Sequence, residues 1–215
     1  MFSYIHTTNC CAKLLNLKIL YLREMKNQAS LYMIMLGCKP KGRFTEQHDI
    51  FFGIANSLVD LVEDLKHFWP EAKGQIHIDA WQKVTQVDGY TIEIISKIEK
   101  TATNQQQLFF INLGGYKENE FEEYHYKVLT VAQNKAEAIK KAKLTSFYKH
   151  YGFKGATSHI DDKYGVDVDD LYDIQEILAK QYKQKYQLHF KPSTSIYKDE
   201  LHIGYLKIDK ITSTM

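Results

Sequence analysis

The sequence predicts an α+β protein in which one ββαβ unit occurs twice. Residues 31–62 align with residues 108–139 without a gap and share eight identical positions. A second block, residues 77–94, pairs with residues 159–176 in the same order and shares seven identities. Two blocks in the same order at nearly equal spacing indicate an internal duplication. We therefore expect mostly antiparallel sheet with helices packed on it, and two halves related by a pseudo-two-fold axis, within one sheet or as two packed lobes.

The first strand of each unit is a short, almost wholly apolar run. These runs, residues 31–36 and 108–113, end at Gly37 and Gly114. Continuous apolar runs of this length are typical of strands buried on both faces. Neither glycine lies in a phosphate-binding loop motif, so we interpret each as a strand-ending turn. After a polar loop, the segments IFFGIA and KVLTVA are rich in β-branched and aromatic residues and predict second strands that pair with the first.

A helix follows the second strand in both copies. In the first copy it opens at Asn56 or Ser57 and ends before Pro70, because proline cannot continue a helix. In the second copy Asn134, with Glu137 three residues later, has the pattern of a capping box. Both helices have an apolar stripe, thinner in the second, that should cover the sheet.

The third strand of the unit is clearest at residues 90–94, where apolar and polar residues alternate. In the second copy, residues 169–182 fit either a strand or a helix, and the repeat register favours a strand first and then a short helix. Residues 186–190 and 201–208 predict two closing strands joined through a turn at Pro192.

These elements divide the chain into four parts. Met25 stands just before the first repeat, so residues 1–24 are either an over-long reading of the gene or an N-terminal amphipathic helix, and both interpretations stay open. The expected parts are an N-terminal extension at 1–25, the first repeat at 26–100, the second repeat at 101–180 and the closing strands at 181–215.

Charge and cysteine content restrict the partners and the location. The net charge of +2 arises from residues 1–24, which hold three cations and one acid, so the rest of the chain is neutral. Nucleic-acid binders need a clustered cationic surface, and we expect no nucleic-acid partner. Three cysteines without a C-x-x-C pair, and no apolar stretch long enough to span a membrane, indicate a cytoplasmic protein. Self-association or a protein partner is compatible with these features.

Imidazole and carboxylate side chains recur at matching positions of the two copies. Residues two apart on a strand point to the same side, so a Glu-x-His pair or a His-x-Asp pair presents both groups together. Such groups bind divalent metals such as zinc, manganese or iron, or act as general acid and base. The candidate residues are Glu46, His48, His77 and Asp79 in the first copy and Glu123, His125, His159 and Asp161 in the second.

A structural role for the same residues is the competing interpretation. Carboxylates and imidazoles at strand ends commonly hydrogen-bond the backbone of an adjoining loop and anchor it. The spacings lack the specificity of an H-E-x-x-H motif, and ligand contact without a metal is a third alternative. We therefore carry two functions: a non-catalytic binding or assembly module, and a metal-assisted hydrolase-like enzyme. Convergence of Glu46, His48, His77 and Asp79 around an open pocket would favour the enzyme, whereas side chains that point into the loop backbone would count against it.

The two blocks also resemble a known family. A strand, a glycine, a loop with E-x-H and then H-I-D is similar to the bacterial family catalogued as domain of unknown function 1543. The motif residues are Gly37, Glu46, His48, His77 and Asp79, and again Gly114, Glu123, His125, His159 and Asp161. The chain looks like a two-copy member. The resemblance implies the architecture and no chemistry.

Overall fold

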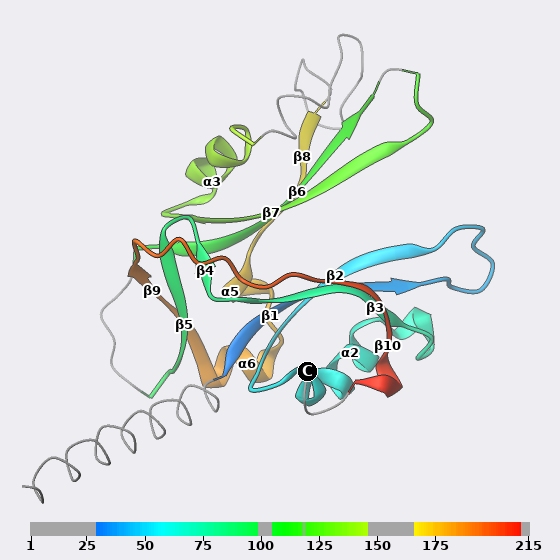
Figure 1. The fold of residues 1–215 in the computed structure, drawn as a ribbon, viewed down its shortest axis with the longest axis horizontal. Helices are drawn as coiled ribbons and strands as arrows, with labels where there is room; N and C mark the ends of the chain where they lie inside the picture. The colour runs from blue at the N-terminus through cyan, green and yellow to red at the C-terminus, as the bar shows by residue number, and fades with distance from the viewer. Residues whose placement is uncertain (1–28, 99–104, 118, 146–165, 212–215) are drawn as a thin grey trace, which may run out of the picture.

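The computed structural model describes residues 29–98, 105–117, 119–145 and 166–211. The protein is α+β, with mostly antiparallel strands and a few short helices (Figure 1). Within the described residues the strands form three sheets, with the orders β10-β3-β1-β2, β7-β6-β8 and β4-β5-β9. The strand orders β3-β1-β2 and β8-β6-β7 place equivalent strands of the two halves in the same relative positions.

The first sheet is built around β1 (Ser30–Cys38). It pairs antiparallel with β2 (Gln47–Ala55) on one side, as predicted, and with β3 (His77–Val84) on the other. β10 (His202–Lys207) adds to the outer edge of β3. Gly37 therefore lies inside a paired strand, and its interpretation as a strand-ending turn is wrong.

Short helices cover one face of this sheet. A 3-10 turn at Leu58–Leu61 leads into α2 (Val62–Phe68), and a second 3-10 turn begins at Pro70, which ends the helix as predicted. The side chains of Leu58, Leu61 and Leu65 are fully buried against β1 and β2.

The second sheet consists of β6 (Gln107–Tyr116), β7 (Glu123–Ala132) and β8 (Val166–Asp173). Helix α3 (Lys135–Ala142) begins where the sequence predicts, and the Asn134 side chain accepts a hydrogen bond from the Glu137 amide at 3.0 Å. Glu137 in return accepts from the Gln133 amide and not from Asn134. The predicted cap at Asn134 is thus confirmed, but the second hydrogen bond of the capping box is donated by the amide of Gln133 instead of that of Asn134.

The third sheet corrects the predicted end of the repeat. Residues 90–94 belong to β5 (Tyr90–Ser96), which pairs with β4 (Gln86–Val87) and β9 (Tyr186–Pro192), and not with β1. The strand that completes the first unit is β3. Alternation reveals that a segment is a strand but not which partner it hydrogen-bonds to. After β8 come two short helices, α5 (Ile174–Ile177) and α6 (Lys180–Lys185), as the repeat register predicted.

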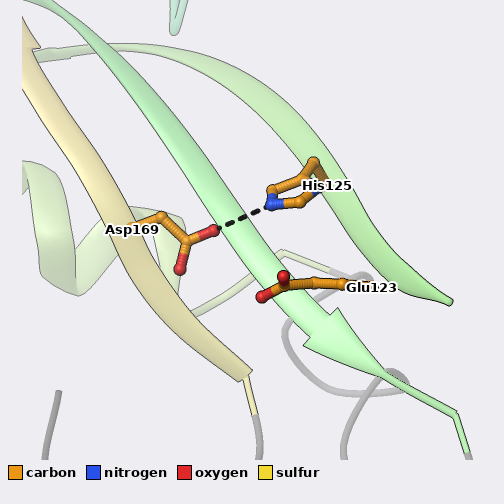
Figure 2. A group of neighbouring side chains, drawn as sticks. All are labelled: Glu123, His125 and Asp169. Atoms are coloured by element: carbon orange, nitrogen blue, oxygen red, sulfur yellow. Dashed lines mark ion pairs between the residues drawn. The ribbon is translucent and has the colours of Figure 1, made fainter. Parts of the chain in front are cut away.

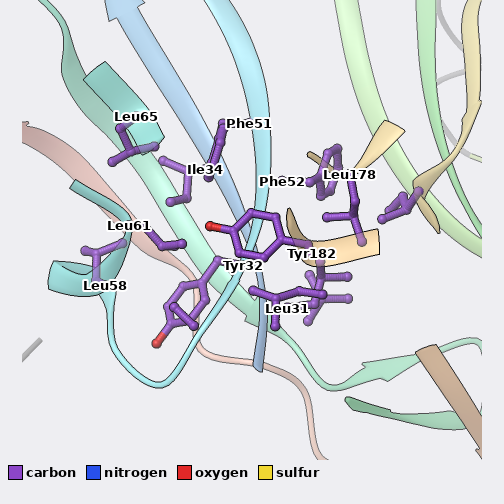
Figure 3. Packing of buried hydrophobic residues seen from close by; sticks show 14 of the residues in the cluster. Leu31, Tyr32, Ile34, Phe51, Phe52, Leu58, Leu61, Leu65, Leu178 and Tyr182 are labelled. Carbon is purple, nitrogen blue, oxygen red and sulfur yellow. The ribbon is translucent and has the colours of Figure 1, made fainter. Parts of the chain in front are cut away.

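Side chains from both halves of the chain pack around β1. Figure 3 shows Leu58, Leu61 and Leu65 from the short helices after β2, and Leu178 and Tyr182 from the segment after β8. The hydroxyl of Tyr182 also donates to Asp64 of α2, and burial together with this hydrogen bond raises the pKa of Tyr182. Elements from both halves of the chain therefore share one core.

The first and second sheets meet through aromatic side chains. Phe52 of β2 and Phe110 of β6 are in edge-to-face contact, with ring centroids 5.4 Å apart. From this contact the β1–β2 and β6–β7 hairpins extend in the same general direction and diverge (Figure 1). Among the described residues, no helix is both long and apolar enough to cross a membrane. The cytoplasmic location and self-association stay predictions.

We expect Phe52→Ala to lower the free energy of unfolding by about 3–5 kcal/mol, because it leaves a cavity where the sheets meet. Phe44→Ala is the matched control: its side chain is 97% exposed, and its removal should change stability by less than about 0.5 kcal/mol. Urea unfolding measures both values. Equal effects of the two substitutions would contradict a core shared by the two sheets.

Candidate metal centre

The four first-copy candidates lie around Gly37, near the hairpin end of the first sheet. Gly37 is paired with His48 on β2 and with His77 on β3. A register shift between Met35 and Leu36 leaves Asp79 out of the regular pairing. A Cβ atom on Gly37 would overlap with the Asp79 carboxylate and with His77 Nε2, so the missing side chain provides the space these groups occupy.

The ligand atoms of these residues converge. His77 Nε2 lies 2.9 Å from Glu46 Oε1 and 3.3 Å from Asp79 Oδ1. His48 Nε2 lies 3.3 Å from Asp79 Oδ2 and 3.9 Å from Glu46 Oε2. We refer to Glu46, His48, His77 and Asp79 as the first cluster. The sequence identified all of its members.

The first cluster runs from the core to the surface. His77 is only 8% exposed and packs against the Tyr205 ring, with centroids 4.3 Å apart, whereas the His48 and Glu46 side chains are 42% and 43% exposed. Among the described residues, His77 Nε2 and Asp79 Oδ2 are buried without a hydrogen bond. The Glu46 oxygen is close to His77 Nε2 but lies outside hydrogen-bonding geometry. Buried polar atoms in this state require an explanation, and a bound ion is one.

Two neighbouring residues could not be assigned from the sequence. Tyr205 comes from β10, far along the chain, and no local pattern connects it to His77. Cys38 follows Gly37, and its thiol is buried beside the first cluster. Burial, with a smaller contribution from the Glu46 charge, raises the pKa of this thiol. The thiol is therefore kept protonated.

A second cluster occupies the matching position of the second sheet. It consists of Glu123, His125 and Asp169, whose ligand atoms all lie within 4.8 Å of one another (Figure 2). His125 Nε2 is 3.3 Å from Asp169 Oδ2. Gly114 pairs with His125, and a Cβ atom on Gly114 would overlap with the Asp169 carboxylate. In both sheets, a glycine of the central strand therefore lies next to a cluster of imidazole and carboxylate groups.

Strand β8 contributes Asp169, a residue that the sequence did not single out, to the second cluster. Gly37 lies opposite His77, whereas Gly114 lies opposite Asp167, so Asp169 takes the position of Asp79. This strand register differs by eight residues from the sequence alignment, which paired His77 with His159. Aligning D-V-D-D-L (167–171) with H-I-D-A-W (77–81) places Asp169 at the position of Asp79. The predicted His159 and Asp161 lie outside the described residues.

The second cluster differs in its surroundings. Tyr116 is paired with Glu123, and its pKa is raised mainly by a hydrogen bond with Glu123, with burial and the charges of Glu123 and Asp169 adding to it. The phenol is thus held neutral next to the carboxylates. The first cluster has two imidazoles, and the second has one imidazole and this phenol.

Both clusters border one groove. His48 and His125 line a hollow of about 460 Å³ between β2 and the second sheet, with Ile50 and Phe110 also in its lining. Exposed imidazoles from the two halves therefore face a shared, solvent-accessible space, which we call the inter-sheet groove.

Residues 43–94 match the family model described as Domain of Unknown Function (DUF1543). The resemblance predicted from the motifs is confirmed over these residues, which contain the whole first cluster. A crystal structure of protein Il1583 from Idiomarina loihiensis is similar in fold, with a TM-score of 0.51 and 18% identity, covering 84% of this chain and 98% of that chain. No curated protein matches the chain.

We expect Gly37→Ala to lower the free energy of unfolding by about 1–3 kcal/mol, because its Cβ overlaps with Asp79 and His77. Asp79→Ala removes one of these groups, so the double variant should lose less than the sum of the single losses. Urea unfolding of the four proteins, all metal-free, measures this coupling. If the two losses of stability were strictly additive, contact with the Asp79 side chain would not be the reason that Gly37→Ala is destabilising.

Proposed function

We propose that the protein is a divalent-metal-binding module built on a duplicated ββαβ unit, with one metal site in each copy. The observation that carries this proposal is the buried His77 Nε2, which has no hydrogen bond among the described residues although Glu46 and Asp79 converge on it. A metal ion bound to this nitrogen could take a neighbouring carboxylate as a further ligand. Loop anchoring requires hydrogen bonds between these side chains and the backbone of the loop. In the described structure, none is found for the four residues of the first cluster.

The separations between ligand atoms support a shared ion. Two atoms bound tetrahedrally to one zinc ion at ~2.0–2.1 Å lie about 3.3 Å apart. The four nitrogen–oxygen separations in the first cluster, which involve both oxygens of each carboxylate, are between 2.9 and 3.9 Å. In the second cluster, one ligand atom from each of Glu123, His125 and Asp169 lies within 4.8 Å of the other two. Two imidazoles with two carboxylates suit zinc, iron or manganese.

The second cluster supports the two-copy part of the proposal. The sheets have matching strand orders, and each places a Glu-x-His pair and an aspartate around a glycine. A duplication of the whole unit explains both the shared identities and this recurrence.

Metal-assisted hydrolysis is a second candidate, favoured by one observation. A catalytic metal needs an open coordination position, and His48 and His125 both border a groove. In that case the metal would polarise a substrate or activate water, and the exposed carboxylate of Glu46 is the group next to it that could take up a proton.

Metal analysis tests the proposal. Protein purified without a His tag, stripped with a chelator and reconstituted with zinc or manganese, should retain one ion per cluster. His77→Ala and Glu46→Gln should lose the ion of the first cluster. His202→Ala is the control, since His202 stacks on Trp81 outside both clusters, and it should retain both ions. A metal content well below one per chain in the native protein would refute the proposal.

His48→Ala separates metal binding from loop anchoring. Because the His48 side chain is 42% exposed, the metal-free variant should stay within about 0.5 kcal/mol of the native stability. Zinc should then raise the melting temperature of the native protein more than that of the variant, because a ligand of the folded state stabilises it. Thermal melts with and without zinc give both readings. A large loss in the metal-free variant would instead support anchoring.

A further inference from the structure

Strand β10 forms an open edge of the first sheet. It pairs with β3 on one side, and within the described residues no strand pairs with its other side. The backbone amide and carbonyl groups along an unpaired edge can hydrogen-bond a further strand, and proteins usually protect such an edge with charged side chains. The side chains of β10 therefore decide whether this edge is protected.

The side chains on and beside this edge are large and apolar. Leu201, Ile203 and Tyr205 are 55%, 78% and 64% exposed, and Tyr197 in the preceding segment is 62% exposed. We call these four residues the edge patch. Tyr197, Ile203 and Tyr205, together with Trp81 of β3, line a hollow of about 740 Å³. Exposed apolar side chains gathered in one place are typical of protein–protein contacts.

Charged residues of opposite sign lie at the two ends of β10. Residues 198–200, before the strand, carry two acids and one cation, whereas residues 207–210, at its end, carry two cations and one acid. The Glu200 side chain is 78% exposed, and Lys207 is also exposed. An antiparallel neighbour of the same sequence would place its cationic end beside the acidic end of β10. A parallel neighbour would place like charges together, which is unfavourable.

We propose that a second copy of the chain covers this edge, with the two β10 strands antiparallel across a two-fold axis. Such an axis brings the same patch of both copies together, so the two edge patches cover each other. Because β10 carries acids at one end and cations at the other, it is complementary to itself in the antiparallel direction. This self-complementarity favours a second copy over an unrelated peptide strand.

A bulge limits what the backbone contributes to this dimer. The register of β10 against β3 shifts between Ile203 and Leu206, and Gly204 in this interval has a φ of 133°. A bulge disrupts the regular ladder of hydrogen bonds. The edge patch and the charged ends therefore supply most of the affinity, and we expect a dissociation constant in the micromolar range.

Sedimentation equilibrium of the whole chain tests the dimer, which does not depend on the proposed metal binding and should form with and without zinc. Glu200→Lys and Lys207→Glu should each raise the dissociation constant at least about tenfold, which is about 1.4 kcal/mol, because each brings like charges together at two symmetry-related contacts. The double variant exchanges the two signs and should regain most of the native affinity. Glu122→Lys is the matched control: Glu122 is exposed just before β7, and the substitution changes the net charge equally without weakening the dimer.

Several results would overturn the proposal. Native protein that stays monomeric at about 1 mM would do so, as would a dimer that neither single reversal weakens or that Glu122→Lys weakens equally. A double variant as weak as the single ones would rule out the antiparallel arrangement. Hydrogen exchange of the native protein avoids reliance on variant folding: β10 amides should exchange more slowly at high than at low concentration. Slower exchange in β2, at the opposite edge of the sheet, and not in β10 would contradict the proposed interface.

Discussion

Strand β1 contributes four fully buried side chains to the core, and the other elements are arranged around it. Tyr32, Ile34 and Leu36 share one face of the strand and have no exposed surface; on the opposite face Leu31 is fully buried, whereas Met33 and Met35 are partly buried. Each buried side chain of this size contributes roughly 1.5–3 kcal/mol. Next to Gly37, near the end of β1, polar groups from the neighbouring strands take the place of large apolar side chains. The position of the first cluster therefore follows from where the covered part of β1 ends.

Placing polar groups at this boundary has an energetic cost. A buried polar atom without a hydrogen bond costs about 1–3 kcal/mol, and the first cluster holds two such atoms within the described structure, His77 Nε2 and Asp79 Oδ2. A protein that needed only to anchor a loop would pair these atoms with backbone groups. The arrangement instead matches a site whose ligand completes it, which is why geometry favours binding over anchoring.

The two clusters have the same strand arrangement and differ in their side chains. In both, a glycine in the central strand leaves room for an aspartate, and a Glu-x-His pair comes from the next strand. The first cluster adds a second imidazole from His77, whereas the second adds a neutral phenol from Tyr116. Nitrogen donors favour zinc-like ions and oxygen donors favour harder ones, so the proposed metal binding would differ in preference between the two clusters. The Phe52–Phe110 contact brings both sites to one groove.

The sequence by itself determined the strands of both hairpins, the cap at Asn134, the stop at Pro70 and the four residues of the first cluster. These depend on local periodicity, on backbone chemistry and on residues two apart sharing a side. Only the tertiary structure decided that β3 and not β5 pairs with β1, that Asp169 belongs to the second cluster, and that Gly37 makes room for the first cluster. The reason is physical: strand partners and close approaches depend on register between distant segments, and a one-dimensional pattern does not contain that register.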